Sequence, residues 1–222
     1  MNQRRVVQNR WPRPTPVLGL WFALMLGFTT DASIPSSVTG SCSEAAECGT
    51  DFVRSVEDRE RILAMVSEHR RRASDSWREH LTDAIYQEAV SAEVDPLLVA
   101  SIVATESSFK SRVVSRAGAV GLMQLRPFVA RDVADRNDVE WFGLETLHSP
   151  RLNVRLGIVY YKELVQRFDG DATLALAAYN RGPSRVSGQL RNGTYRAGSY
   201  AETVLRLYAS LDRDRRETPT RA

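Results

Sequence analysis

Residues 95–109 have the sequence DPLLVASIVATESSF, which combines a helix start, an apolar helix face and one acidic side chain. The Asp-Pro pair at 95–96 is typical of a helix N-terminus, with Asp as N-cap and Pro at the first helical position. Leu98, Ile102 and Glu106 are spaced by four residues, so they stack along one face of the predicted helix. Glu106 therefore lies at the C-terminal end of an apolar stripe.

The environment predicted for Glu106 favours acid–base chemistry. Burial disfavours the charged form of a carboxyl group, and the negative end of the helix dipole acts in the same direction, so both raise its pKa. A raised pKa is what a general acid needs near neutral pH. The alternative is a solvated glutamate at a frayed helix end, and the spacing alone leaves both interpretations open.

Two later segments add groups that are suited to binding a saccharide. Residues 121–125 (GLMQL) combine a glycine, which allows close backbone approach to a ligand, with an amide that donates and accepts hydrogen bonds. Residues 174–182 (LALAAYNRG) end an apolar helix at Tyr179-Asn180, before a glycine turn. An aromatic face, amides and few fixed charges suit a glycan groove. Taken singly, Met123 and Tyr179 are better explained by core packing.

The rest of the chain predicts helices and no strands, because no segment shows a persuasive two-residue alternation. Ser76-Trp77-Arg78-Glu79 has the form of a capping box that opens a helix. Apolar spacing and intervening Gly and Pro residues predict further helices at 51–73, from 96 onward, and at 126–135, 151–168, 172–179, 183–190 and 199–211. We therefore expect an all-α, mainly helical fold.

The chain of 222 residues, 43% of them hydrophobic, is long enough for one domain with additions and too apolar for a disordered protein. We expect one mostly helical domain at 76–211, preceded by a helical extension at 51–75 and a Ser- and Gly-rich linker at 33–50. Residues 212–222 are predicted to form a charged, frayed tail.

Residues 1–32 have the pattern of an export segment. Arg4, Arg5, Arg10 and Arg13 precede the uncharged run 17–28, VLGLWFALMLGF. That run is too short for a comfortable membrane-spanning helix, which needs about 20 residues, and it suits the apolar part of a secretory signal. We expect a periplasmic or cell-envelope protein. An uncleaved inner-membrane anchor is the alternative.

The basic balance of the chain belongs to this segment. The net charge is +3, and without residues 1–32 the chain holds 26 basic and 26 acidic residues. The run Arg70–Arg72 is interpreted as a solvated helix end, because runs of like charge usually face solvent. We therefore expect no nucleic-acid partner.

Cys42 and Cys48 are the two cysteines of the sequence. In an exported protein they can close a small disulfide loop. Two cysteines and three scattered histidines do not make a zinc site, so we expect neither a metal nor another cofactor.

Together these motifs resemble the soluble lytic transglycosylases, lysozyme-like enzymes that cleave peptidoglycan. The resemblance covers roughly residues 82–211. It rests on motifs that follow in the family's order: 92–98 (AEVDPLL), 106–109 (ESSF), 121–125 (GLMQL), Pro150 with Asn153 and Gly157, 178–180 (AYN), and Tyr200. Phe128-Val129 and His148 depart from the family's pattern.

The resemblance implies that the domain has the lysozyme-like fold and that Glu106 is the single catalytic acid and base. It also implies substrate-binding roles around that carboxyl group. Gln124, Tyr179 and Asn180 would line the saccharide cleft, Ser115 and Tyr200 would flank the reacting sugar, and Met123 would form part of the cleft floor.

The reaction is expected to need one carboxylate. No acidic residue lies between Glu106 and Asp132, and no motif supplies the second carboxylate that hydrolytic glycosidases use. The resemblance implies cleavage of the MurNAc-β-1,4-GlcNAc bond with formation of a 1,6-anhydroMurNAc end. The alternatives are a lysozyme-like muramidase and a non-catalytic peptidoglycan-binding or assembly factor of a secretion apparatus. We expect a monomer whose partner is the glycan strand, with a secretion-system or other envelope-assembly partner left open.

Overall fold

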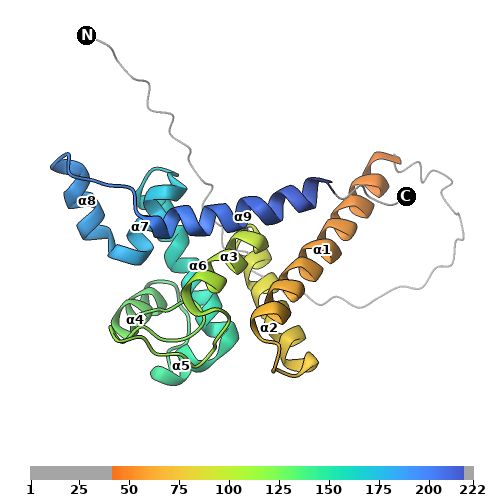
Figure 1. The fold of residues 1–222 in the computed structure, drawn as a ribbon, viewed down its shortest axis with the longest axis horizontal. Helices are drawn as coiled ribbons and strands as arrows, with labels where there is room; N and C mark the ends of the chain where they lie inside the picture. Colours follow the sequence, from red (N-terminus) through yellow and green to blue (C-terminus); the bar gives the residue numbers. More distant parts are fainter. Residues whose placement is uncertain (1–41, 218–222) are drawn as a thin grey trace, which may run out of the picture. The chain divides into compact units, whose positions relative to one another are not determined.

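The computed structural model describes residues 42–217. In that range nine helices follow one another: α1 Cys42–His69, α2 Asp75–Ser91, α3 Pro96–Ser107, α4 Pro127–Arg136, α5 Leu144–His148, α6 Pro150–Arg167, α7 Ala172–Arg181, α8 Pro183–Arg191 and α9 Ser199–Glu217 (Figure 1). No regular strand occurs among these residues, and two isolated bridges, Val114 with Val120 and Val120 with Leu125, tie together the loop between α3 and α4. The predicted all-α fold is confirmed.

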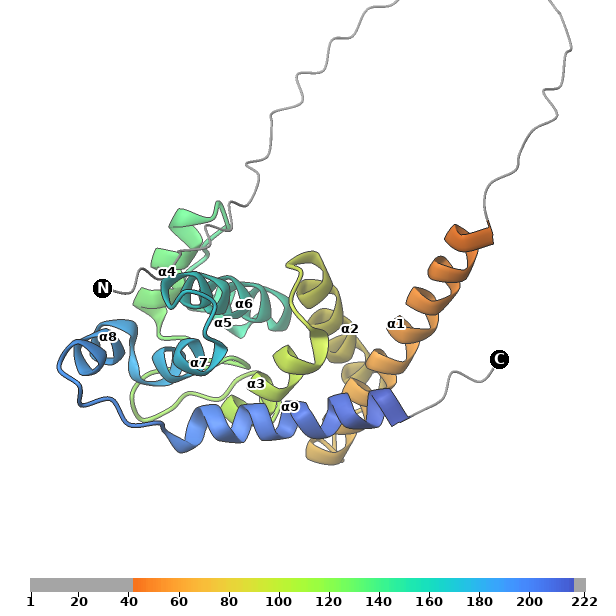
Figure 2. The ribbon, with the colours of Figure 1, turned by 90° about the horizontal axis from the view of Figure 1, so that it is seen from above.

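Helix α3 forms the centre of the packing. It contacts α1, α2 and α9, and side chains on all of its faces are buried, including Leu97, Ile102 and Val103. A helix that is apolar all round is stable only when neighbours cover every face, which explains its sequence. Helix α6 packs against α2, α4, α5 and α7 and so links the two sides of the molecule (Figures 1 and 2).

Helix α1 begins nine residues earlier than the sequence predicted. Its first residue is Cys42, so residues 42–50 are helical and the predicted linker at 33–50 is wrong for that part. Ser and Gly content indicated a linker, but tertiary packing of the same helix further along outweighs such local preferences. Residues 33–41, like the predicted export segment 1–32, lie outside the described residues.

The predicted disulfide between Cys42 and Cys48 stays a prediction, because the structure describes the backbone of these residues and not their side chains. Cys42 and Cys48 are six residues apart in α1, and a rise of 1.5 Å per residue separates their Cα atoms by about 9 Å along the axis. A disulfide spans at most about 7 Å between Cα atoms. Formation of the predicted bond would therefore require the first turns of α1 to unwind.

Helix α1 shares its hydrophobic core with the helices that follow it. Ile62, Met65 and Val66 are buried in the same hydrophobic core as residues of α2, α3 and α6. The predicted boundary at 75–76 therefore lies within a continuous core, and the helical extension packs on the domain that it precedes. Apolar residues at helical spacing were visible in α1, but spacing does not show which neighbour covers a face.

Helix ends follow their capping side chains. The Asp95 carboxylate accepts a hydrogen bond from the Leu97 N–H at 2.9 Å, which confirms the predicted start of α3. The start of α2 differs from the prediction, because Ser74 is the N-cap and accepts from the Trp77 N–H at 3.3 Å. Ser74 has the extended backbone that an N-cap requires, whereas Ser76 lies inside the first turn.

The predicted frayed tail is helical as far as Glu217 and is tied to the core. Arg215 on α9 is 13% exposed, and it pairs with Asp58 of α1, with Asp95 and with Asp212. The Tyr208 hydroxyl also donates to Asp95, at 2.8 Å. The charged side chains of this tail are ordered because they pair with residues of other helices. The sequence of the tail alone does not reveal those partners. Residues 218–222 lie outside the described range.

Helix α5 was not predicted, because five residues are too few to show a helical period. Among residues 42–217, no helix has both the length and the apolar character to cross a membrane.

Candidate active site around Glu106

Glu106 lies in the last turn of α3, where the chain changes direction sharply. The next residue ends the helix, and Ser108 and Phe109 both adopt left-handed backbone conformations, with φ of 48° and 58°. Such angles are unfavourable for residues other than glycine. Phe109 is fully buried, and its ring packs edge-on against His69 of α1 with the centroids 5.4 Å apart. This anchor fixes the end of α3 and with it the position of Glu106.

The Glu106 carboxyl group has the protonation behaviour that its sequence position predicted. Burial raises its pKa from 4.5 to about 7, while a hydrogen bond from Tyr200 acts in the opposite direction. The Tyr200 hydroxyl donates to Glu106 Oε1 at 2.6 Å. A carboxyl group with a pKa near neutral is able both to donate a proton and to take one back.

Tyr200 and Tyr179 surround this carboxyl group with aromatic rings. Burial, and next the charge of Glu106, raise the pKa of both phenols well above their ordinary value, so both stay protonated. The Tyr179 ring packs against Tyr160 with the centroids 5.3 Å apart, and its hydroxyl donates to the Met123 carbonyl at 2.8 Å. The structure therefore brings Glu106, Tyr179 and Tyr200 together from α3, α7 and α9.

A buried asparagine organises the loop that carries Gln124. Asn153 of α6 is fully buried, and its Oδ1 accepts from the Met123 N–H at 2.8 Å. Its Nδ2 donates to the carbonyls of Val120 and Leu147, each at 3.0 Å. One amide thus satisfies three backbone groups, two in the loop between α3 and α4 and one in α5. Sequence reasoning used Asn153 only as part of a motif and missed this positioning role.

Two glycines allow the same loop to lie against α6. A Cβ atom on Gly121 would lie 2.2 Å from Asn153 Nδ2, and one on Gly157 would lie 2.3 Å from Met123 Sδ. Gly121 also has a φ of 83°, which favours glycine. The polar Asn153 and the small Gly157, four residues apart on an otherwise amphipathic helix, were the available sequence signal for this contact.

Met123 does not present its side chain to a ligand. The side chain is fully buried against Gly157, and its backbone is engaged by Asn153 and Tyr179. The structure thus contradicts an exposed cleft-floor role for this side chain. Burial behind the Gln124 loop is the physical reason, and core packing was the alternative that the sequence left open.

The remaining predicted residues differ in how freely they can bind a substrate. Gln124 has a left-handed backbone, and its Nε2 donates to the carbonyls of Gly121 at 2.8 Å and Val113 at 3.2 Å. Ser115 Oγ accepts from the Ala119 N–H at 3.0 Å and so belongs to the loop turn. Asn180 is exposed beside Tyr179 at the end of α7.

Two cavities lie away from this carboxyl group. One of about 700 Å³ is lined by α2, α6 and the α4–α5 connection, including Glu88 and Lys162. The other, of about 390 Å³, lies at the turn of residues 68–73. Glu106 lines neither cavity. In the part of the chain from 42 to 217, no cluster of three or more His, Cys, Asp or Glu residues is arranged to hold a metal ion.

Comparison with known families gives a match at the same residues. The sequence model described as "Transglycosylase SLT domain" matches residues 83–200, which include Glu106 and every other residue placed in the site.

Curated relatives share this region. A transglycosylase of Enterobacteria phage PRD1 is 35% identical over 109 residues, which are 48% of this chain and 37% of that protein. The soluble lytic murein transglycosylase of Escherichia coli K12 is 30% identical over 110 residues, 49% of this chain and 17% of that protein. The chain thus spans well under half the length of these relatives.

Solved structures agree in fold. A lytic transglycosylase Slt from Pseudomonas aeruginosa, solved as an inactive mutant, superposes with a TM-score of 0.54 at 28% identity, covering 59% of this chain and 24% of that one. The 70 kDa soluble lytic transglycosylase of Escherichia coli gives a TM-score of 0.58 at 23% identity over 71% of this chain and 29% of that one, a likeness of fold.

Proposed function

Because this chain belongs to the transglycosylase SLT domain family, we propose that it is a lytic transglycosylase that cleaves the MurNAc-β-1,4-GlcNAc bond of peptidoglycan. The observation that carries the proposal is the Glu106 carboxyl group. It is half-buried, it has a pKa near 7, and it is the one acidic side chain in the segment from Thr105 to Arg131.

The first step is a proton transfer to the leaving group. Protonated Glu106 donates to the glycosidic oxygen, and the bond between that oxygen and C1 of MurNAc breaks. Positive charge then develops at C1, where the neighbouring N-acetyl carbonyl oxygen of the substrate stabilises it, as in substrate-assisted glycosidases. No second protein carboxylate is needed for this step.

The second step closes a ring. Ionised Glu106 takes the proton from the C6 hydroxyl of the same sugar, and the C6 oxygen bonds to C1 to give a 1,6-anhydro end. The nucleophile belongs to the substrate, so little positional entropy is lost when it attacks. The hydrogen bond from Tyr200 supports the ionised state of Glu106 between the two steps.

The surrounding groups suit sugar binding. Both hydrogens of the Gln124 amide are directed at backbone carbonyls, which orients its oxygen as an acceptor for a substrate hydroxyl or N-acetyl N–H. Asn180 is accessible for further hydrogen bonds, and Tyr179 and Tyr200 supply aromatic surface beside the reacting bond. We propose these four side chains as the substrate-binding set, with Ser115 shaping the loop.

We also propose that the protein acts in the cell envelope, where its substrate is located. This fits the export segment predicted at residues 1–32. An envelope-assembly or secretion-system partner remains a prediction of the sequence.

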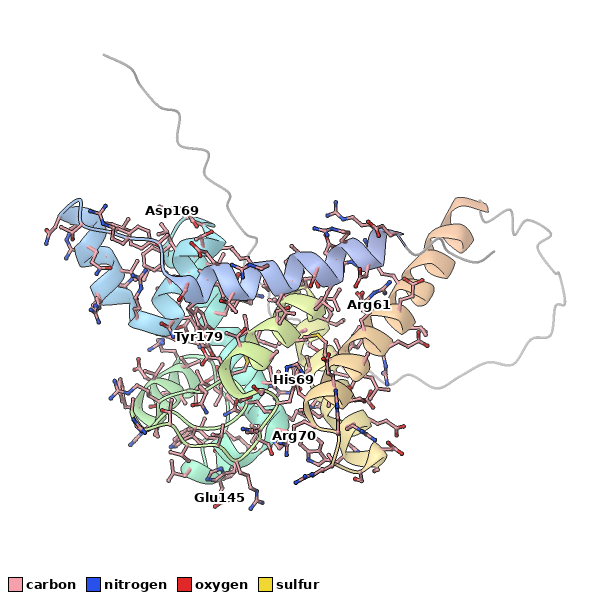
Figure 3. The ribbon with its side chains drawn as sticks, in the orientation of Figure 1. Arg61, His69, Arg70, Glu145, Asp169 and Tyr179 are labelled. Carbon is pink, nitrogen blue, oxygen red and sulfur yellow. The ribbon has the colours of Figure 1, made fainter. Side chains whose placement is uncertain are left out.

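The test is the muropeptide profile of purified sacculi after digestion by wild type and by Glu106→Gln. We expect 1,6-anhydroMurNAc ends from the wild type and at least a thousandfold lower rate for the variant, since the only acid and base is lost. Glu145→Gln, an exposed carboxylate of α5, is the matched control (Figure 3). Near-wild-type digestion by Glu106→Gln contradicts the assignment, and reducing MurNAc ends alone identify a muramidase.

A further inference from the structure

Charge is distributed unevenly between the candidate site and the rest of the protein. Residues 107–131 and 172–201 supply every proposed site residue other than Glu106, and they contain nine basic residues and no acidic one. The remainder of residues 42–217 contains 16 basic and 26 acidic residues. A chain that is close to neutral as a whole thus concentrates positive charge on both segments that flank Glu106.

The second of these segments leaves the site and returns to it. The chain passes Tyr179, continues through α8, and comes back at Tyr200, whose hydroxyl touches Glu106. Arg181 closes the base of this excursion, because its Nη1 donates to the Arg196 carbonyl at 3.1 Å and its guanidinium group lies 5.2 Å from the Tyr195 ring centroid. Both ends of the α8 segment are therefore fixed at the site.

Helix α8 projects from this base. It contacts α7, and Val186 is its one buried residue. Figures 1 and 2 both show α8 at one end of the molecule, beyond α7 and the start of α9. Nine residues give α8 a length of about 13–14 Å. Arg185 follows Tyr179 by six residues and Arg196 precedes Tyr200 by four, so the cations of this segment lie between two residues that border Glu106.

The arginines of this segment are exposed and unneutralised. Arg185 and Arg191 on α8 and Arg196 after it are exposed, and none of them forms a salt bridge within the described residues. Some arginines elsewhere are neutralised: Arg151 and Arg155 of α6 share the buried Glu88, and Arg215 of α9 is surrounded by aspartates. Cations grouped without counter-charges create a positive potential that attracts an anionic ligand.

The loop between α3 and α4 also carries exposed positive charges that no acidic side chain of residues 42–217 neutralises. Its exposed cations with no salt bridge in the described residues are Lys110, Arg112, Arg116 and Arg126, all in the loop between α3 and α4. In Figure 1 the end of α3 lies between this loop and the α7–α8 side of the molecule. The positive charge thus occurs in both segments that supply the proposed site residues around Glu106.

We propose that Arg185, Arg191 and Arg196 bind the carboxylate groups of the peptide stems that peptidoglycan carries, so that the enzyme prefers stem-bearing strands. This rests on the proposed function. Where a stem is attached, the lactyl group of MurNAc is an amide, so the negative charges of the strand lie in the stem. Four extended residues reach about 13–14 Å, so a stem extends well beyond the sugar that carries it. Guanidinium groups recognise carboxylates with paired hydrogen bonds.

The test compares two soluble glycan substrates. Both are GlcNAc–MurNAc oligomers of equal length, one with tetrapeptide stems and one whose lactyl groups carry only L-alaninamide and hence no carboxylate. For each protein, kcat/KM is measured on both substrates. Binding of both is measured by calorimetry in the Glu106→Gln background, so that recognition is observed without cleavage.

The variant is Arg185→Gln/Arg191→Gln, and the matched control is Arg71→Gln/Arg72→Gln. The control removes two exposed arginines at the α1–α2 turn, which Figures 1 and 2 show well away from α8. We expect wild type and the control to prefer the tetrapeptide substrate, and the α8 variant to lose about five- to tenfold of that preference in kcat/KM and in Kd. Salt at 0.5 M should reduce the wild-type preference similarly.

Three results overturn the stem assignment: a wild type without preference in binding, an α8 variant that keeps its preference, or an equal loss on both substrates. Binding of an unrelated polyanion such as DNA as tightly as the stem-bearing oligomer overturns it as well. Absence of cleavage by a wild type that still prefers stems in binding counts against the proposed transglycosylase activity and leaves stem recognition supported.

Discussion

The Glu106 side chain is held in an environment that is unfavourable for its charge. Burial acts against ionisation, and only the hydrogen bond from Tyr200 acts for it. This carboxyl group therefore costs stability at the pH at which it works, which is a common feature of catalytic groups. Its position was visible in the sequence because the spacing with Leu98 and Ile102 placed a carboxyl group on an apolar helix.

Glu106→Gln is therefore expected to stabilise the fold at high pH. The folded-state pKa is raised from 4.5 to about 7, so the unfolded chain ionises first and stability falls as the pH rises from 4.5 to 7. The glutamine side chain of the variant does not ionise, so the variant does not lose stability over this pH range. Thermal unfolding should show no advantage for the variant at pH 4 and an advantage of about 1–2 kcal/mol at pH 8, discounted for partial exposure. An advantage that is equal at both pH values contradicts the raised pKa.

Tyr200→Phe is expected to move the pH dependence of the reaction. Removing the hydroxyl deletes the interaction that lowers the pKa of Glu106, so that pKa rises further. The alkaline limb of the kcat/KM profile should move to higher pH, and kcat should fall roughly tenfold as the carboxyl group loses its partner. Tyr208→Phe removes a hydroxyl from the same helix that bonds Asp95 instead. Tyr208→Phe should leave the alkaline limb of the kcat/KM profile unchanged. If Tyr200→Phe leaves that limb unchanged as well, the proposed role of Tyr200 is contradicted.

The role of a single residue could be predicted from the sequence where it depends on neighbours within the same helix. Glu106 followed from helix spacing, whereas Tyr200 was reached only through resemblance, because 94 residues separate it from its partner. Asn153 was not assigned a role, since the backbone groups that it satisfies belong to a loop and to the short helix α5, whose course the sequence does not reveal. Met123 was ambiguous between core and cleft, and the contact with Gly157 decides for the core.

At the scale of elements, α6 positions the Gln124 loop through direct contact. We expect Gly157→Ala to destabilise the protein by about 1–3 kcal/mol, because the added methyl group would overlap Met123 and push the loop outward. Activity should fall together with stability. Urea unfolding and the rate on peptidoglycan measure the two effects.

Gly188→Ala on α8 is the matched control for this substitution. Its Cβ would have one neighbour within 4 Å, the end of the Arg191 side chain at 3.9 Å. The control should stabilise α8 by up to about 1 kcal/mol through helix propensity alone. If Gly157→Ala stabilises as Gly188→Ala does, the close approach of α6 and the loop is not real.

Elements were predictable where capping residues and apolar periodicity agree. Asp95-Pro96 opened α3 as expected, and α6 to α8 appeared within two residues of their predicted limits. The beginning of α1 and the end of α9 were missed for a shared reason. Both are polar or charged stretches, and the interactions that order the end of α9 come from other helices.

At the scale of the whole molecule, α1 and the SLT region form one core. We expect a fragment that begins at residue 76 to lose cooperative unfolding, although the family match begins later still, at residue 83. Removal of α1 takes away the buried side chains of Ile62, Met65 and Val66, at roughly 2 kcal/mol each, and leaves Arg215 without Asp58. Such a loss is comparable to the total stability of many domains. Circular dichroism melts of residues 42–222 and 76–222 provide the measurement, and equal melting temperatures contradict a shared core.

Helix α9 contacts both ends of α3: Tyr200 meets Glu106 at one end, and Tyr208 and Arg215 meet Asp95 at the other. Helix α9 therefore braces α3 at both of its ends, although the final residues of α9 resemble a dispensable terminus. An expression design that trims the chain after residue 211, or fuses a rigid tag there, would weaken the contact of α9 with Asp95. The position of Tyr200 against the Glu106 carboxyl group, at the other end of α9, would then be disturbed as well.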